Sequence, residues 1–224
     1  MKAFLLAAGL GTRLRPLTYF APKPLVVLGG RTIIDYALEW LRANGVGEIY
    51  VVGLYMQEVL ASYLREHHPD VVFVPSKKLL GTAGQLYYAR GYMDDGPALV
   101  APSDVVTDLD VRAAADFHVR SSVDLTVVGR EVETEVRFGV LDVAEGRLSA
   151  WREKPRFRHV VSTGIYVAEG SALRRLEERR LDFDEFARSL MPRVAVYVSR
   201  AKFLDVGTLG DLDEVRRALS VINI

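Results

Sequence analysis

The sequence predicts an α/β fold built on a doubly wound, mostly parallel sheet, followed by a β-rich insertion. Three observations support this prediction. Apolar segments of strand length alternate with helical segments up to about residue 130, and such alternation is typical of βαβ units. Short strand-like segments then follow one another with turn residues between them. Half of the 224 residues are hydrophobic, which is enough for a large core in one domain over 1–224.

The alternating half, about residues 1–130, is bounded by clear start and stop signals. Thr32 with Asp35 resembles a helix N-terminal cap, and Asn44-Gly45 is a C-terminal stop. Apolar runs such as 2–7 are short and continuous, as in strands that are buried on both faces. The patterns predict strands at 2–7, 48–53, 71–74, 98–101 and 123–129, and helices at 31–43, 57–67, 84–92 and 110–120.

The second half, about residues 131–224, has a different order of predicted elements, with strand-like segments that follow one another directly. It carries no linker, repeat or low-complexity segment, so we interpret the chain as one domain in two lobes. Thr208 is expected to cap a last helix, with Leu212, Val215 and Leu219 on one face. The patterns predict strands at 137–142, 147–152, 160–168, 194–199 and 202–205, and further helices at 171–180 and 183–190.

Composition excludes several functional classes. The chain has no cysteine, which excludes disulfides, thiolate metal sites and cysteine nucleophiles. Lys+Arg and Asp+Glu both number 29, and this balance argues against a nucleic-acid or membrane-surface partner. No apolar run approaches the length of a membrane span. The apolar start lacks small cleavage-site residues, because Arg13 and Arg15 follow it, so a cytoplasmic location is expected.

A glycine-rich loop follows the first predicted strand. Gly9 and Gly11 would let backbone N–H groups approach a ligand closely, as in loops that cradle phosphates. The loop is not a dinucleotide fingerprint, because residue 14 is leucine where a third glycine would stand. Residues 1–34 contain five basic residues and no acidic one, so this neutral chain concentrates positive charge around its loop. The pattern favours binding of a polyanion.

These residues also carry a resemblance to a known family. The run LLAAGLGTRLRPLT at 5–18, followed by PKPLV at 22–26, resembles the signature of the sugar-1-phosphate nucleotidyltransferases. The similarity continues in order with LGTAG at 80–84, SD at 103–104, FGV at 138–140, EKP at 153–155, TGIY at 163–166 and DVGT at 205–208. It implies a Rossmann-like fold of the GT-A type, in which the β-rich insertion forms the sugar-binding lobe.

The resemblance implies a reaction and a set of roles. A sugar 1-phosphate attacks the α-phosphorus of a nucleoside triphosphate, and pyrophosphate leaves. Arg13, Lys23 and Lys154 would be catalytic, holding the pyrophosphate, the α-phosphate and the sugar's phosphate. Mg²⁺ would be carried by Asp104 and Asp205. The nucleotide would be bound by Ala8, Gly9, Gly11, Thr12, Gly81, Thr82 and Asp104, and the sugar by Gly139, Glu153 and Thr163.

Several alternatives stay open. The motif form is most similar to that of mannose-1-phosphate guanylyltransferases, but thymidylyl or uridylyl transfer to glucose 1-phosphate or a related sugar is also compatible. The family pattern is not followed at 75–79, at Pro102 and at Ser162-Thr163, which leaves base and sugar selection open and permits a non-catalytic, nucleotide-sugar-sensing subunit. The chain is expected to lack the C-terminal left-handed β-helix domain of some relatives. A homo-oligomer stays open.

Overall fold

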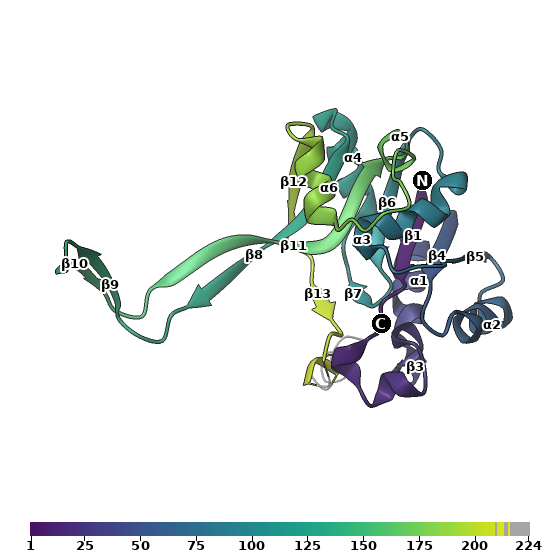
Figure 1. Cartoon of the computed structure of the whole chain (residues 1–224), viewed down its shortest axis with the longest axis horizontal. Coiled ribbons are helices and arrows are strands. Elements are labelled where there is room, and N and C mark those ends of the chain that lie inside the picture. Colours follow the sequence, from purple (N-terminus) through teal and green to yellow (C-terminus); the bar gives the residue numbers. More distant parts are fainter. Residues whose placement is uncertain (209, 213–214, 216–224) are drawn as a thin grey trace.

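The computed structural model describes residues 1–208, 210–212 and 215. Its centre is a seven-stranded sheet in the order β12-β8-β11-β6-β1-β4-β5. The β1–β4, β1–β6, β4–β5 and β8–β12 pairs are parallel, whereas β11 runs antiparallel to both of its neighbours. The predicted mixed, mostly parallel sheet is therefore confirmed (Figure 1).

The sheet strands are β1 (Lys2–Ala7), β4 (Glu48–Gly53), β5 (Val71–Pro75), β6 (Pro97–Pro102), β8 (Leu125–Glu135), β11 (Arg156–Glu169) and β12 (Val194–Ser199). Three small antiparallel pairs join β2 (Val27–Leu28) to β3 (Arg31–Thr32), β7 (Val105–Thr107) to β13 (Phe203–Asp205), and β9 (Val140–Ala144) to β10 (Arg147–Arg152). The α-helices are α1 (Ile33–Ala43), α2 (Gln57–His67), α3 (Gly81–Gly84), α4 (Val111–Ser121), α5 (Gly170–Leu173) and α6 (Phe183–Leu190). The 3-10 helices are η1 (Thr12–Leu14), η2 (Leu17–Tyr19), η3 (Lys23–Leu25) and η4 (Gln85–Tyr92).

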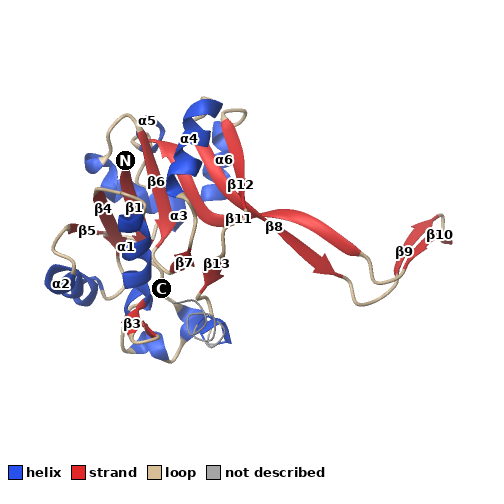
Figure 2. Cartoon of the chain, turned by 180° about the vertical axis from the view of Figure 1, so that it is seen from behind, coloured by secondary structure: helices blue, strands red, loops and turns tan. Residues whose placement is uncertain are grey.

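Helices cover both faces of the sheet, as Figures 1 and 2 show. One core cluster packs α1, α2 and α4 against one face, and a second packs α3, η4, α5 and α6 against the other. Strand β1 contributes to both clusters, because Ala3 and Leu5 face one layer and Phe4 faces the other. This double covering explains why β1 is a continuous apolar run.

Most predicted boundaries lie within a few residues of the observed ones, but two predictions need correction. The expected helix 171–180 reduces to α5, because the chain after it bends back to the start of α3, where the Leu181 N–H donates to the Leu80 carbonyl at 2.8 Å. The expected helix 84–92 forms as η4, a 3-10 helix preceded by α3. Part of the last predicted helix, including Leu219, lies outside the described residues.

The β-rich segment forms a projecting arm rather than a compact lobe. Strand β8 runs from the sheet outward and β11 returns along it to the sheet, so that the two form a ribbon, and the β9–β10 hairpin lies at its tip (Figures 1 and 2). We call residues 130–162 the arm and the rest of the described chain the body. The side chains of β8 are largely buried up to residue 129 and largely exposed beyond it. That this segment forms the sugar-binding lobe, as the resemblance implies, stays a prediction.

Candidate active site

The glycine-rich loop lies where β1 ends, next to the end of β6. In the parallel β1–β6 pair Leu6 faces Pro102, and the Ser103 N–H donates to the Leu6 carbonyl at 3.1 Å. The loop and Asp104 therefore emerge side by side at the carboxyl edge of the sheet, where ligands of α/β proteins collect. A cavity of about 590 Å³ opens there. Its size falls in the usual range for small-molecule sites.

The loop owes its shape to Gly11. This residue has φ +60°, a left-handed conformation that favours glycine, and a Cβ atom there would lie 2.8 Å from the Thr18 methyl carbon. Buried Thr18 fixes the loop from behind by donating its hydroxyl to the Gly11 carbonyl at 2.9 Å. A Cβ atom on Gly9 would instead meet nothing within 4 Å. Gly9 thus leaves open space beside the cavity, whereas Gly11 sets the turn.

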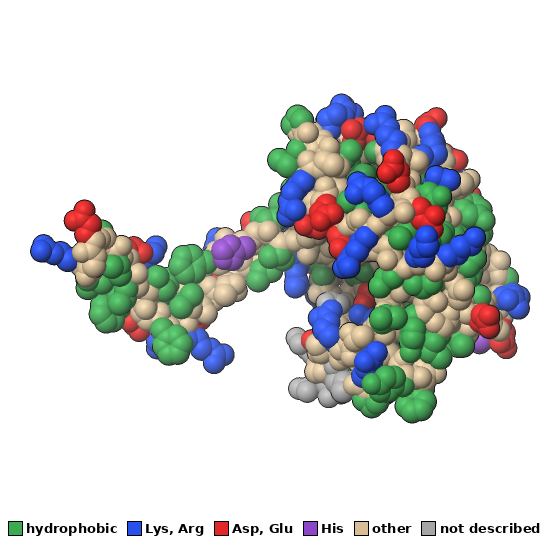
Figure 3. Space-filling view, in the orientation of Figure 1, with side chains coloured by type: hydrophobic (Ala, Val, Ile, Leu, Met, Phe, Trp, Pro, Cys, Tyr) green, Lys and Arg blue, Asp and Glu red, His purple; other side chains and the backbone are tan. Residues whose placement is uncertain are grey.

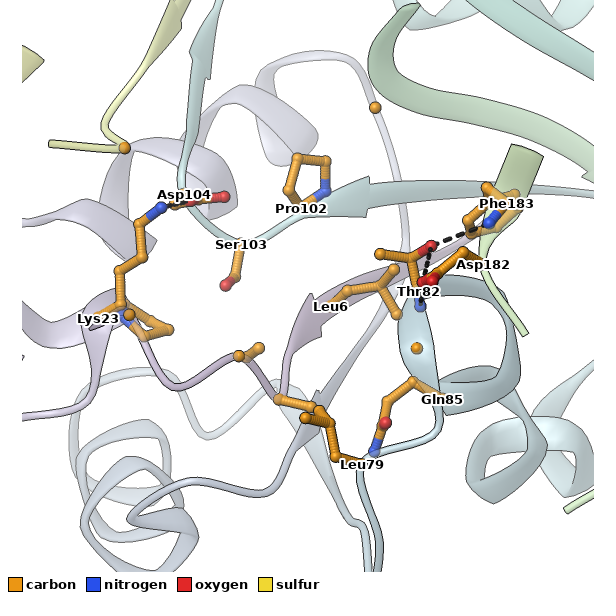
Figure 4. A pocket seen from close by; sticks show the side chains of 18 of the residues that line it. Leu6, Lys23, Leu79, Thr82, Gln85, Pro102, Ser103, Asp104, Asp182 and Phe183 are labelled. Atoms are coloured by element: carbon orange, nitrogen blue, oxygen red, sulfur yellow. Dashed lines mark hydrogen bonds and ion pairs between the residues drawn. The ribbon is translucent and has the colours of Figure 1, made fainter. Parts of the chain in front are cut away.

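Positive and negative charges meet at one end of the cavity. Lys23, which begins η3, forms an ion pair with Asp104, and both side chains are mostly buried (Figure 4). Arg13 of η1 also lines the cavity. Two cations therefore stand beside the glycine loop, and one of them is positioned by a carboxylate. This arrangement suits a ligand that carries several negative charges.

The other end of the cavity is built from two helix starts that exchange hydrogen bonds. The backbone N–H and the hydroxyl of Thr82 donate to Asp182 Oδ1 at 2.8 and 3.2 Å, and the Phe183 N–H donates to the Thr82 hydroxyl at 2.9 Å (Figure 4). Gly81 has φ +78° and no room for a Cβ atom, which would lie 2.7 Å from the Leu181 carbonyl oxygen. The two segments are thereby locked together as one wall.

An aromatic pair continues this wall. Tyr166 of β11 stacks on Phe183 with ring centroids 3.9 Å apart, and both line the cavity. Burial raises the pKa of Tyr166 above its ordinary value, so its hydroxyl keeps its proton at neutral pH. The pair offers a flat apolar surface with a polar edge, opposite the charged end.

The cavity collects all the residues that the sequence assigns to the nucleotide side, together with two of the three predicted catalytic cations. They are Ala8, Gly9, Gly11, Thr12, Arg13, Lys23, Gly81, Thr82 and Asp104. The backbone of Asp205 also lies nearby, since β13 places it opposite Val105, directly after Asp104. The side chain of Asp205 lies outside the described residues.

The residues assigned to the sugar side lie elsewhere. Gly139, Glu153 and Lys154 are all in the arm and outside the cavity lining. Thr163 stands where the arm joins the body, and its hydroxyl donates to the Val128 carbonyl at 2.8 Å. Its neighbour Gly164 lines the cavity instead. The structure thus separates the predicted site into a nucleotide half in the body and a sugar half in the arm.

Comparison with known proteins places this geometry in a family. A sequence model described as nucleotidyl transferase matches residues 2–220. The chain belongs to the nucleotidyl transferase family.

Individual relatives agree with this assignment. The chain is 36% identical over 190 residues to a mannose-1-phosphate guanyltransferase of Schizosaccharomyces pombe, covering 80% of this chain and 52% of that protein. It is 34% identical over 196 residues to the Emericella nidulans protein of the same name, covering 83% and 54%. The chain therefore spans about half the length of these relatives.

Two solved structures share the fold of this chain. The crystal structure of HddC from Yersinia pseudotuberculosis superposes with a TM-score of 0.77 at 25% identity, covering 97% of this chain and 99% of that one. A putative glucose-1-phosphate thymidylyltransferase from Bacillus anthracis gives a TM-score of 0.78 at 21% identity, covering 100% and 97%.

Sequence reasoning missed three residues that shape this nucleotidyl transferase cavity. Asp182, Arg180 and buried Gln85 all line it. Gln85 accepts from the Leu80 N–H at 3.0 Å and so holds the turn before Gly81. The position of Asp182 before the apolar start of α6 was a usable signal, because aspartate is a common N-cap, but its contact with Thr82 spans 100 residues.

The oxygen ligands near the loop fit a magnesium ion. Among the described residues no group of three or more His, Cys, Asp or Glu side chains could hold a metal ion. Mg²⁺ is commonly bound by one or two carboxylates together with substrate phosphates. Asp104 supplies such a carboxylate inside the cavity.

In the part of the chain that the structure describes, no helix is both long and apolar enough to span a bilayer.

Proposed function

We propose that this chain transfers a nucleotidyl group from a nucleoside triphosphate to a sugar 1-phosphate and releases pyrophosphate. The observation that carries the proposal is the joining of the glycine loop, Arg13, Lys23 and Asp104 in one cavity. The reaction brings two polyanions together, so the catalyst must neutralise and align them.

The residues divide this task. Backbone N–H groups of the glycine loop, with Arg13, would hold the β- and γ-phosphates, which leave as pyrophosphate. Lys23 would bridge the α-phosphate and the leaving oxygen. An oxygen of the sugar's phosphate forms a bond to the α-phosphorus as the bond to the β-phosphate oxygen breaks. No proton needs to move, because the attacking oxygen is already ionised.

A magnesium ion would be held by Asp104 and Asp205 together with phosphate oxygens. When bound, it supplies positive charge that offsets the charge of the triphosphate. The ion pair with Lys23 shows that the Asp104 carboxylate can hold a cation at this end of the cavity.

The substrates we favour are GTP and mannose 1-phosphate. Relatives with 31–36% identity bear the name mannose-1-phosphate guanyltransferase or a close variant of it. Thymidylyl or uridylyl transfer to glucose 1-phosphate or a related sugar is the alternative within the same reaction. We further propose that the enzyme works in the cytoplasm, without a nucleic-acid or membrane partner, in keeping with its zero formal net charge.

A substrate matrix tests the proposal. Five nucleoside triphosphates are combined with several sugar 1-phosphates, with and without Mg²⁺, and pyrophosphate release is measured. We expect release only when all three components are present, and the fastest rate with GTP and mannose 1-phosphate. Release without a sugar 1-phosphate, or no release in any well, contradicts the proposed reaction.

A second function is favoured by one observation. Lys154, which would grip the sugar's phosphate, lies outside the cavity of its own chain. A regulatory subunit that senses nucleotide sugars would need the cavity but not this lysine. Tight binding of an NDP-sugar by calorimetry, with no turnover across the matrix, supports this second function.

A further inference from the structure

The arm has the features of a segment that lacks its partner. It is a two-stranded ribbon with no core of its own, and such ribbons are at best marginally stable in water. Its apolar side chains are exposed, with 78% of Phe138 and 63% of Trp151 accessible to solvent. Leu141, Val143, Leu148 and Val160 are also exposed along it, and Figure 3 shows the apolar side chains gathered towards the tip. Apolar surface of this kind marks an interaction site.

The tip is nevertheless a built structure. The Trp151 Nε1–H donates to Glu153 Oε2 at 3.2 Å, and a Cβ atom on Gly139 would lie 2.5 Å from Trp151 Nε1 and 3.0 Å from Glu153 Oε2. Because residue 139 is a glycine, the side chains of Trp151 and Glu153 can pack directly against it. Lys154 is held at φ +43°, a costly conformation for a lysine. Strained residues of this kind cluster at functional sites.

The paired backbone of the arm carries it away from the cavity of its own chain. The β8–β11 ladder runs from Ala168↔Leu125 in the body to Arg156↔Glu135 in the arm, with one irregularity between Ser162 and Tyr166. From Ser162 to Arg156 the chain advances by about 20 Å, at about 3.3 Å per residue. Docking onto another molecule requires no change in this ladder, whereas reaching the chain's own cavity requires the ribbon to bend.

Ion pairs also connect the two strands of the ribbon. Arg156 lies 3.2 Å from Glu133 and 3.4 Å from Glu135, and Arg158 lies 3.3 Å from Glu133. All of these pairs bridge β8 and β11. They join the two strands within the arm, and as exposed pairs each contributes little to its stability.

We propose that the chain acts as a reciprocal dimer in which the arm of each copy enters the cavity of the other. This inference rests on the proposed function, because it assigns the missing sugar half of each site to the partner's Glu153 and the partner's Lys154. The occupant is a second copy because each chain offers both an unpartnered arm and a cavity that lacks these residues. In a two-fold symmetric dimer that exchanges its arms, each arm lies in the partner's cavity and each cavity receives an arm, so the assembly is closed.

Cross-linking tests the arrangement without relying on activity. The chain has no cysteine, so a double variant with Glu153→Cys on the arm and Arg180→Cys on the cavity wall carries only two thiols. A short bismaleimide should convert it into a covalent dimer of twice 25.0 kDa on a denaturing gel. The two single variants are the controls and should form far less of this product. An internal link at the mass of one chain, or no link between the two positions, overturns the proposal.

Subunit complementation tests whether the arm supplies catalytic groups. Lys23→Ala and Lys154→Ala alone are each expected to retain at most about one hundredth of the wild-type rate. Co-expressed with different tags, they should form mixed dimers in which one site has an intact cavity and an intact arm. A random mixture should recover about a quarter of the wild-type rate, since half of the dimers are mixed and each has one intact site.

The outcomes separate this inference from the proposed function. If the arm acted within its own chain, every site in a mixed dimer would carry one lesion and no activity would return. That result overturns the proposal even where the cross-link forms. A wild-type chain that releases no pyrophosphate from any substrate pair contradicts the proposed reaction, while the cross-link still decides where the arm docks.

Discussion

The body and the arm differ in how their conformations are maintained. The body fixes its functional residues with buried contacts, as in the hydroxyl of Thr18 behind the Gly11 turn and the mostly buried Lys23–Asp104 pair. In the arm, the functional residues are held mainly by the backbone pairing of β8 with β11, and exposed ion pairs add little. A side chain in the body therefore carries out both structural and chemical tasks, whereas a side chain in the arm is free to be specialised for chemistry. Mutations in the two regions should have correspondingly different effects.

The largest expected effect separates the two lysines. Lys23→Ala should lower the rate of pyrophosphate release by about 10²–10³, by analogy with loss of a transition-state hydrogen-bond donor. It should also weaken nucleotide binding and lower the melting temperature, because partly buried Asp104 loses its partner. Lys154→Ala should cause a loss of rate of similar size with unchanged melting temperature and nucleotide affinity, since Lys154 is exposed.

Exposed Lys202, which lies outside the cavity lining, provides the matched control for these variants. Lys202→Ala should leave rate, melting temperature and nucleotide affinity unchanged. Calorimetry with a non-hydrolysable nucleotide measures binding separately from turnover. If Lys154→Ala weakened nucleotide binding as strongly as Lys23→Ala, the separation into a nucleotide half and a sugar half would be wrong.

Two glycines of one loop provide the next test. Gly11→Ala should lower the free energy of unfolding by about 1–3 kcal/mol, the usual cost of a strained backbone conformation. Gly9→Ala should leave stability unchanged, because its methyl group meets no atom within 4 Å. It should instead raise the KM for the nucleoside triphosphate, since the methyl group would occupy the space beside the loop. Denaturant titration and steady-state kinetics of both variants decide the matter, and equal stability losses would contradict this division of roles.

The success of sequence reasoning follows the same division. Strands of the body were placed closely because a strand buried on both faces is a continuous apolar run, as in β1. The glycine loop and Asp104 were expected at one edge of the sheet because they follow β1 and β6 directly, whereas Gly81 and Thr82 were assigned through the family resemblance. Local patterns were sufficient wherever position along a strand also determines position in space.

The arm could not be predicted in this way. Its sequence correctly indicated strands, but the signal for a strand is the same whether the strand packs in a lobe or projects into solvent. The contact between Thr82 and Asp182 could not be predicted for a related reason, because two segments 100 residues apart are brought together only by the complete fold. The expected helix at 171–180 failed because hydrogen bonds to the start of α3 compete with helical ones near Leu181.

A smaller effect should come from the wall that joins α3 to α6. Thr82→Val removes the hydroxyl that donates to Asp182 and accepts from the Phe183 N–H. We expect a loss of about 1 kcal/mol in the free energy of unfolding, the usual net contribution of such hydrogen bonds at a solvent-accessible position. Thr82→Ser keeps the hydroxyl and is the matched control. A valine variant with wild-type stability would mean that this wall does not depend on the exchange.

The smallest expected effect is the response of the body to acid. Burial alone would raise the pKa of Asp35, but hydrogen bonds from His68, Thr32 and Tyr63 outweigh it and hold the pKa below its ordinary value of 3.8. A carboxyl whose pKa is depressed on folding stabilises the protein above its unfolded pKa, and this contribution is lost as the pH falls from about 4 through the lower folded value. Asp35→Asn should therefore flatten the fall in melting temperature between pH 5 and pH 3. Glu133→Gln in the arm should leave that curve unchanged, since exposed ion pairs contribute little to stability. An equal response of the two variants would show that the arm is held as firmly as the body.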